Sequence, residues 1–304
     1  MPKQVDVVRN AWKAGVVLPA FNIPYLPMME PVIQAVADEE SFALISSAQI
    51  EWETLESKGP QEVMDEFQKW NQPDYVRLHL DHVCSVNEVD NQANDYYSVI
   101  KRAIEIGFPS VMIDGSHEKN LEDNIAVTKR VVDLAHAKGV LVEGEVGQIF
   151  GYADETTPDY DELLENRMGF TTAEQAQRMV EESGVDWLSV AVGNLHGAMV
   201  GAGRYKEKVK STLDLDLIKE ISDATGGPLV VHGGSYVDID CLRVAMKNGV
   251  AKMNVAKDIR SRYQAVMQES NDVLKAKQTV YERVRWLMNE HYQISGISKV
   301  ITAE

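Results

Sequence analysis

Histidines gather at particular points of this chain, and imidazole is the commonest side-chain ligand of transition metals. Of the seven histidines, five lie at the ends of short apolar segments that are typical of β-strands. Three or more neutral imidazoles that converge from different strands form a good Zn²⁺ site with one position open for substrate. A single histidine at a strand end is more often a hydrogen-bonded structural residue, but the joint pattern predicts a metal site. The five are His79 and His82 in HLDH, His117 in IDGSH, His196 in GNLHG and His232 in LVVHGGS.

Carboxylates accompany these imidazoles. Asp81 lies between the two histidines of HLDH, Asp114 ends the next predicted strand, and Glu143 and Glu145 lie on the one after it. Near a bound dication such groups can be ligands, partners of ligands, or general acids and bases. Asp114 is the carboxylate least easily explained as an ordinary surface residue, because it lies inside the apolar run SVMIDGS. Burying a carboxylate there is costly, which indicates that it has a specific partner or role.

The sequence does not fix which side chains of the HLDH segment face the same side of the strand. Strict alternation along a strand places His79 and Asp81 on one face and His82 on the other. A strand that ends at Asp81 would release His82 from that constraint. The pattern therefore leaves open which histidine of this segment binds metal.

Two glycine-rich turns follow histidines. Gly197 follows His196, and Gly233, Gly234 and Ser235 follow His232. Glycines let backbone N–H groups approach an anion, and the loops after strands 7 and 8 of a barrel are a usual phosphate site. Ser235 could add a hydroxyl donor and Lys257 a positive charge. GGS alone indicates only a tight turn, and the chain has no strand-linked GxGxxG or Walker lysine motif that would predict a nucleotide site.

The elements that must position these residues alternate along the chain. Short β-rich runs are separated by segments with the apolar spacing of helices. Repeated alternation implies parallel strands joined by right-handed crossovers, and eight units favour a closed (β/α)8 TIM barrel of the α/β class over an open doubly wound sheet. The predicted strands are Val16–Asn22, Phe42–Ser47, Tyr75–Leu80, Ser110–Asp114, Val140–Val146, Asp186–Val192, Pro228–His232 and Ala251–Val255. The predicted helices include Met28–Glu40, Glu88–Gly107, Leu121–Lys138, Thr172–Ser183, Asp214–Ala224 and Asp238–Asn248.

We expect one barrel domain over residues 1–304, because no linker or low-complexity tract divides the chain. The widest irregular stretch, Gly147–Phe170, is either an active-site lid or a solvated excursion. From about residue 258 the charged helical patterns predict a C-terminal extension that packs outside the barrel or at a subunit contact.

Composition excludes several classes of protein. With 47 acidic against 30 basic side chains and a formal net charge of −17, the chain lacks the basic face that nucleic acid or an anionic membrane would require. One local positive site could still bind an anionic substrate. Two cysteines, Cys84 and Cys241, are too few for a disulfide framework. There is no apolar run of ~18 residues and no signal-peptide core at the start, so we expect a cytoplasmic protein.

Seven segments, in this order, resemble those of the class II, metal-dependent ketose-bisphosphate aldolases of the fructose- and tagatose-bisphosphate type. The resemblance covers about Ala20 to Asp258, and the set is highly specific although each segment alone would be modest. The segments are AFNI at Ala20–Ile23, HLDH at His79–His82, GFPSVMIDGSH at Gly107–His117, VEGEVGQ at Val142–Gln148, GNLHG at Gly193–Gly197, PLVVHGGS at Pro228–Ser235 and KMNVA at Lys252–Ala256.

The resemblance implies a (β/α)8 barrel, a catalytic Zn²⁺ and a homodimer or homotetramer. The metal ligands would be His82, His196 and His232. Asp114 and Glu145 match carboxylates that belong to a second divalent position or surround the ligands. A zinc ion in this position polarises a ketose carbonyl and stabilises the enediolate that forms as the carbon–carbon bond breaks, so no Schiff-base lysine is needed.

The resemblance also assigns the residues around the substrate, a sugar phosphate. Asp81 would be the acid/base for the hydroxyl of the cleaved bond, Asn254 would hydrogen-bond the enediolate, and Asn22 would be a polar group below the substrate. The phosphate loops, which in the family also hold a monovalent cation, are matched by Gly197, Gly233 and Ser235.

The metal and enediolate residues match the family pattern, whereas several departures around them concern substrate choice. The lid glutamate that moves a proton on the triose carbon falls on Ala153, and the phosphate-binding threonine after the last strand is Lys257, which still offers a charge to a phosphate or carboxylate. We therefore expect aldol cleavage of a ketose phosphate or bisphosphate other than ordinary fructose 1,6-bisphosphate, giving a triose phosphate of the dihydroxyacetone phosphate type and an aldehyde. The other departures are Ala48 for a serine, Met199–Val200 for Tyr-Lys and Tyr236 for a glycine.

Two other functions remain open from sequence. A metal-dependent sugar-phosphate epimerase or isomerase would use the same enediolate without cleaving a carbon–carbon bond, and the loss of the lid glutamate makes that reading reasonable. A non-catalytic sugar-phosphate-binding protein on the same scaffold is the third possibility. Asp81 and Asn254 argue against it, because a binding protein needs no group for proton transfer.

Overall fold

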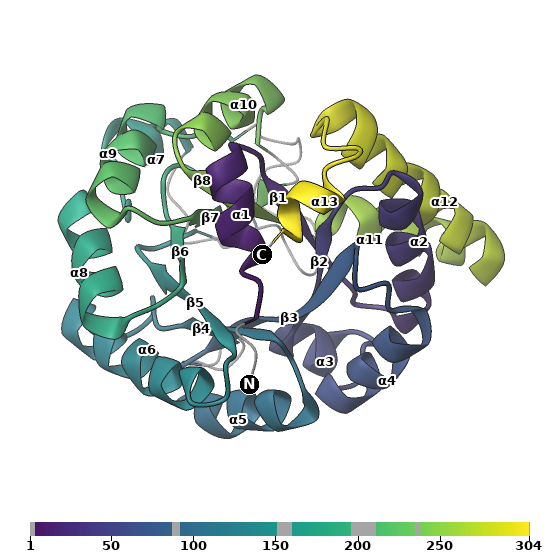
Figure 1. Ribbon diagram of the computed structural model, residues 1–304, viewed down its shortest axis with the longest axis horizontal. Coiled ribbons are helices and arrows are strands. Elements are labelled where there is room, and N and C mark those ends of the chain that lie inside the picture. The colour runs from purple at the N-terminus through teal and green to yellow at the C-terminus, as the bar shows by residue number, and fades with distance from the viewer. Residues whose placement is uncertain (1–3, 87–91, 151–159, 196–210, 235–236, 304) are drawn as a thin grey trace.

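Eight parallel strands close into a barrel in their order along the chain, and β8 pairs with β1 to complete it (Figure 1). The computed structural model describes every residue except 1–3, 87–91, 151–159, 196–210, 235–236 and 304. The pairing of β8 with β1 confirms the predicted TIM barrel and excludes the open sheet. The strands are β1 (Leu18–Asn22), β2 (Ala43–Ala48), β3 (Val76–Cys84), β4 (Ser110–Asp114), β5 (Leu141–Val146), β6 (Trp187–Val190), β7 (Leu229–Val231) and β8 (Val250–Val255).

Helices surround the barrel and connect successive strands (Figure 1). They begin at side-chain caps where the sequence offers them: Asn120 accepts from the Asp123 N–H at the start of α6, and Thr172 and Gln175 form a capping box on α8. The helices that alternate with the strands are α2 (Met29–Asp38), α3 (Gln49–Thr54), α4 (Pro60–Trp70), α5 (Tyr96–Ile106), α6 (Leu121–His136), α7 (Tyr160–Glu165), α8 (Ala173–Ser183), α9 (Leu215–Thr225), α10 (Ile239–Lys247) and α11 (Lys257–Ser270), with a 3₁₀ turn, η1 (Leu26–Met28), before α2.

Two predicted boundaries differ from the structure by four residues or more, and the others by at most two. β3 was expected to end at Leu80 but continues to Cys84. The helix predicted from Glu88 begins only at Tyr96, because Asp95 caps it by accepting from the Ser98 N–H. The stretch predicted as irregular, Gly147–Phe170, contains the short helix α7, whose Tyr160 hydroxyl donates to the Gly193 carbonyl at 2.9 Å.

An apolar plug closes the N-terminal end of the barrel. Within the barrel this plug consists of the buried side chains of Leu18, Phe42, Leu44, Trp187 and their neighbours. Helix α1 (Val7–Ala14) lies across this end beside α13 (Ser298–Ile301), as Figure 1 shows. The polar interior is thereby confined to the opposite end, where the strands finish. That end is where barrel enzymes carry out chemistry.

The helices that follow β8 pack outside the barrel. After α11, the helices α12 (Val273–Trp286) and η3 (Leu287–His291, a π-helical turn) follow, and α12 packs against both α11 and α2. Arg283 of α12 makes a salt bridge to Asp258 of α11, with Nη2 and Oδ2 2.6 Å apart. Among the described helices, none combines the length and the apolar character needed to cross a membrane.

Candidate active site

A β-bulge in β3 turns His82 into the barrel. Leu80 lies opposite Val111 and Val83 opposite Ile113, so β3 advances by three residues where β4 advances by two. His82 takes up the extra residue with a φ of 37°, a conformation that is uncommon without glycine. Asp81 and His82 therefore both face the interior, which alternation alone does not allow. The bulge therefore gives His82 the inward direction that strict alternation would deny it.

Three of the predicted metal residues meet at this end of the barrel. One ligand atom from each of His82, Glu145 and His232 lies within 4.8 Å of the other two. The rings of His82 and His232 meet edge to face with centroids 4.4 Å apart. Ser189 donates to Glu145 Oε2 at 3.0 Å, and Asn194 donates to the His232 carbonyl at 3.2 Å. These contacts, from β6 and the loop after it, fix the positions of the carboxylate and of the His232 backbone.

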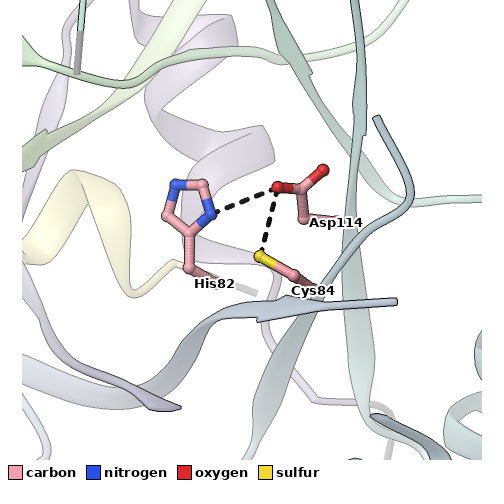
Figure 2. A group of neighbouring side chains, drawn as sticks. All are labelled: His82, Cys84 and Asp114. Atoms are coloured by element: carbon pink, nitrogen blue, oxygen red, sulfur yellow. Dashed lines mark hydrogen bonds and ion pairs between the residues drawn. The ribbon is translucent and has the colours of Figure 1, made fainter. Parts of the chain in front are cut away.

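A second group shares His82 and is drawn in Figure 2. His82 Nδ1 lies 3.6 Å from Asp114 Oδ2, and the Cys84 thiol lies 3.5 Å from the same oxygen. Asp114 is nearly inaccessible to solvent, with 1% exposure, and also accepts from the Ser116 N–H. Asp114 is thus adjacent to His82, another predicted metal ligand, with Cys84 beside it.

Asp81 is held between two asparagines that were also predicted for the site. Asn22 Nδ2 donates to Oδ2 at 2.9 Å, and Asn254 Nδ2 donates to Oδ1 at 2.8 Å. All three side chains are buried, and Asn22 Oδ1 has no hydrogen-bond donor among the described residues. β1, β3 and β8 each contribute one member, so the barrel itself fixes the orientation of the carboxylate.

A buried network lies beside these groups and was not predicted as part of the site. The Glu143 carboxylate lies 2.8 Å from Lys252 Nζ, 2.9 Å from His232 Nε2 and 3.4 Å from His79 Nε2. All four side chains are buried. Lys252 also donates to Asn254 Oδ1 at 2.6 Å. The network therefore links His232, a predicted metal ligand, to the asparagine that holds Asp81.

Electrostatics favour an ionised Asp81 and a neutral His232. Burial opposes the charge of Asp81, but Lys252 and the nearby imidazoles outweigh it and lower the pKa of this carboxyl. Burial and the neighbouring His82 lower the pKa of His232 to about 4, so its imidazole is in the neutral form that binds metals.

The remaining groups show an excess of negative charge. Burial and then the charge of Asp114 raise the pKa of Glu145 well above its ordinary value. Burial works against the charged form of His82, but the hydrogen bond to Asp114 and the charges of Glu145 and Asp81 raise its pKa well above the usual range. Both shifts mean that this pocket takes up positive charge, which a dication would supply.

Glu51, at the start of α3, is a further buried carboxyl near the site that sequence reasoning missed. It is 2% exposed, and its Oε2 accepts from the Ala48 N–H at 3.1 Å. Burial, reinforced by the charge of Asp81, raises its pKa to about 7. Glu51 lies three residues after the helix N-cap, which is the spacing of a capping box. The N-cap residue is Ala48, which has no polar side chain, so the sequence did not identify Glu51 as a capping residue.

The predicted phosphate residues are only partly described. Gly233 directly follows His232 and has a φ of 73°, and a Cβ on it would overlap the Leu195 carbonyl oxygen, so the fold itself requires glycine there. Lys257 is the half-buried first residue of α11. His196, Gly197 and Ser235, as well as the departures at Ala153, Met199–Val200 and Tyr236, lie outside the described residues.

Sequence reasoning missed the roles of Lys252 and Cys84 for identifiable reasons. Lys252 sits inside the apolar strand VAKMNV, and a buried ammonium needs a partner, so the signal was present. Cys84 lies beyond the predicted end of its strand. Glu143 and His79 were noticed on their strands but not joined, because their contact depends on barrel closure.

The donor set fits a zinc ion. Two imidazoles and a carboxylate from three different strands or strand ends lie close enough to share one ion, and one of the imidazoles is neutral. Nitrogen and carboxylate oxygen are the donors of catalytic zinc sites, which keep a further position open. The partners of these ligands, Ser189 for Glu145 and Glu143 for His232, are of the kind that orient metal ligands.

Comparison with known proteins points the same way. A family model described as fructose-bisphosphate aldolase class-II matches residues 3–300. A fructose-bisphosphate aldolase of Giardia intestinalis is 38% identical over 174 residues, which are 57% of this chain and 46% of that protein. The chain thus spans about half the length of this curated relative.

Solved structures share the fold. The crystal structure of the YdjI aldolase from Escherichia coli K12 has a TM-score of 0.74 and 23% identity, covering 97% of this chain and 99% of that one. The crystal structure of a putative fructose-1,6-biphosphate aldolase from Coccidioides immitis also gives 0.74 and 23%, covering 96% of each chain. Since the family model spans nearly the whole barrel and the chain's own motifs meet at one end of it, this protein belongs to the class-II fructose-bisphosphate aldolase family.

Proposed function

We propose that this protein is a zinc-dependent aldehyde-lyase that reversibly cleaves a ketose phosphate or bisphosphate into a triose phosphate and an aldehyde. The observation that carries the proposal is Asp81, an ionised carboxylate held by Asn22 and Asn254 at the residue next to a metal-site histidine. A group for proton transfer beside a metal site is what aldol chemistry needs.

The cation would be held by His82 and His232 together with His196, with Glu145 and Asp114 beside them. When bound, it supplies a Lewis acid that polarises a carbonyl group and stabilises negative charge on its oxygen. The proximity of His82, Glu145 and His232 and the excess of carboxylates support this assignment. Asp114 and Glu145 could also hold a second divalent ion, as in the family resemblance.

Asp81 is the group that moves the proton. In cleavage its carboxylate takes the hydroxyl proton from the carbon that becomes the aldehyde, and in condensation it returns that proton. Its lowered pKa keeps it ionised at neutral pH. One donor on each carboxylate oxygen holds its plane fixed, so a substrate hydroxyl would approach in one orientation.

The two asparagines have further capacity for substrate. A side-chain amide has two N–H donors; Asn254 gives one to Asp81, and the other can reach an oxygen of the three-carbon fragment. Asn22 Oδ1, buried and without a donor among the described residues, can accept from a substrate hydroxyl. Both contacts extend the predicted roles of these residues.

Gly197, Gly233, Ser235 and Lys257 would bind the phosphate, with a monovalent cation in the same loops. Lys257 supports this, since it adds an ammonium to the N-terminus of a 14-residue helix, where anions are favoured. The departures at Ala153 and Lys257 lead us to propose a ketose phosphate other than fructose 1,6-bisphosphate. We also propose a homodimer or homotetramer, which light scattering would measure.

The decisive test is triose-phosphate release from a panel of ketose phosphates and bisphosphates, with protein either loaded with Zn²⁺ or stripped by EDTA. Release from one member that depends on Zn²⁺ would support the proposal and identify the sugar. If Zn²⁺ binds but no member is cleaved, the lyase proposal fails. Interconversion of substrates without cleavage would then indicate an epimerase or isomerase, and binding alone a non-catalytic protein.

A further inference from the structure

Helix α7 joins the two ends of the loop that leads from β6 to α9. Its first residue, Tyr160, is 7% exposed, and its hydroxyl donates to the Gly193 carbonyl at 2.9 Å. The same hydroxyl accepts from the Thr212 N–H at 2.7 Å. Gly193 lies at the start of this loop and Thr212 at its end, and together they form what we call the loop base. One side chain thus links both halves of the loop base.

The two halves of the loop base lie very close together. Gly193 has a φ of 101°, and a Cβ on it would lie 2.5 Å from the Thr212 carbonyl oxygen. Next to this contact, the Asp214 N–H donates to the Val192 carbonyl at 2.8 Å. A tyrosine hydroxyl can donate and accept at once. Tyr160 therefore bridges the two backbone segments where they meet.

Packing and charge hold α7 in this place. Leu163 of α7 and Leu195 of the loop form one buried cluster with Tyr160, and the two leucines are 1% and 2% exposed. Arg167, just after α7, makes a salt bridge to Asp214, with Nη2 and Oδ2 2.7 Å apart. This part of the irregular stretch after β5 is therefore anchored to the loop base on several sides.

The first residues of the same loop touch the turn that carries His232. Asn194 Nδ2 donates to the His232 carbonyl at 3.2 Å, and the Leu195 carbonyl oxygen lies against Gly233. His196, another proposed metal ligand, directly follows Leu195 in the sequence. Whatever fixes this end of the loop therefore fixes the backbone of one proposed ligand and the residue before another.

We propose that Tyr160 is a positioning residue of the metal site, which acts by holding the loop base in place beside the turn at His232. This inference rests on the proposed function, because it concerns the zinc site proposed there. Removing the hydroxyl takes the donor from the buried Gly193 carbonyl and unlinks it from Thr212, so this end of the loop shifts toward another donor. The ligands are then no longer held in place before the ion arrives, and zinc binds more weakly.

The test measures zinc affinity rather than turnover. Full-length wild type, Tyr160→Phe and Tyr281→Phe are stripped with EDTA and titrated with Zn²⁺ in competition with a chromogenic chelator. Tyr281→Phe is the matched control, because it also removes one tyrosine hydroxyl, which donates to Asp38 of α2 on the outside of the barrel.

Two measurements on the metal-free proteins separate positioning from general stability. Hydrogen exchange on peptides that contain Gly193 and Thr212 reports whether the loop base has opened. Circular dichroism and thermal unfolding report on the fold as a whole.

We expect Zn²⁺ to bind Y160F roughly 10–100-fold more weakly than wild type, with faster exchange confined to the peptides of the loop base. Its affinity for Y281F should be unchanged. Equal affinities of Y160F and wild type, or an equal loss in Y281F, overturn the inference and leave the proposed function to the lyase assay.

A Y160F chain that has lost its fold, or in which exchange rises throughout the barrel, also overturns the inference, because Tyr160 is then a general structural residue. If the wild type itself binds no Zn²⁺, the zinc site of the proposed function fails, and this inference fails with it.

Discussion

Lys252 and Glu143 form an ion pair inside the barrel, with Nζ and Oε2 2.8 Å apart and neither side chain exposed. Lys252 also donates to Asn254, which in turn donates to Asp81. Glu143 contacts His232 on its other side. The pair thus joins the proposed metal site to the proposed base through side chains alone.

Replacing this lysine should be costly. Lys252→Met leaves the buried Glu143 charge without its ammonium, and breaking a buried pair costs about 3–5 kcal/mol of unfolding free energy. Urea denaturation measures the loss. Lys219→Met, which breaks the exposed Lys219–Asp223 pair of α9, is the control and should cost about 0.3–0.5 kcal/mol. Equal losses of unfolding free energy in the two variants would show that the buried pair contributes no more to stability than the exposed one.

Asp81→Asn tests the proton-transfer role. An amide cannot accept the substrate proton, and loss of a general base lowers kcat by roughly 10²–10⁴-fold. Zinc content should stay at the wild-type level, since Asp81 is not among the proposed ligands. Asp240→Asn, on the exposed face of α10, is the control with unchanged kcat. Full activity of the D81N protein on a cleaved substrate would remove Asp81 from the mechanism.

Glu51 makes stability depend on pH. Its pKa is raised from 4.5 to about 7 in the folded protein, so folding favours the protonated form. The resulting stabilisation, on the order of 3 kcal/mol, is complete below the unfolded pKa and is lost as pH rises through the folded value.

Glu51→Gln has no proton to lose and should remove this component of the pH dependence between pH 5 and 8. Glu53→Gln, on the exposed part of the same helix, should retain it. Denaturation of wild type and both variants at the two pH values provides the comparison. A wild-type profile that matches E51Q would mean that Glu51 titrates normally.

Gly233→Ala tests whether the turn after His232 depends on glycine. A non-glycine residue at a φ of 73° and a Cβ against the Leu195 carbonyl should cost about 1–3 kcal/mol from backbone strain alone. His232 should be displaced with it, which would weaken zinc binding. Gly227→Ala, where the nearest atom to a new Cβ is 3.9 Å away, should stay within about 0.5 kcal/mol of wild type. Calorimetry and a zinc titration on the two variants distinguish local strain from a general sensitivity of this region.

The barrel itself was predictable, because strand and helix periodicity repeat and parallel strands can be joined in few ways. The direction of His82 was not. Alternation counts residues, whereas the bulge depends on hydrogen bonding to β4 and on a positive φ at a histidine. The Lys252–Glu143 pair was also beyond sequence reasoning as a contact, because β5 and β8 meet only through the closed interior. The roles expected of His196, Gly197 and Ser235 stay predictions.

The bulge in β3 also has an evolutionary side. Leu78, Leu80 and Val83 all face the outer apolar layer, two residues apart and then three. Losing the single codon for Asp81 would restore regular alternation, keep these apolar residues facing outward and leave His82 facing inward. The barrel would retain a proposed metal ligand and lose its proposed base. Under the proposed function, a single-codon deletion would therefore turn this fold into a protein that binds a sugar phosphate without cleaving it.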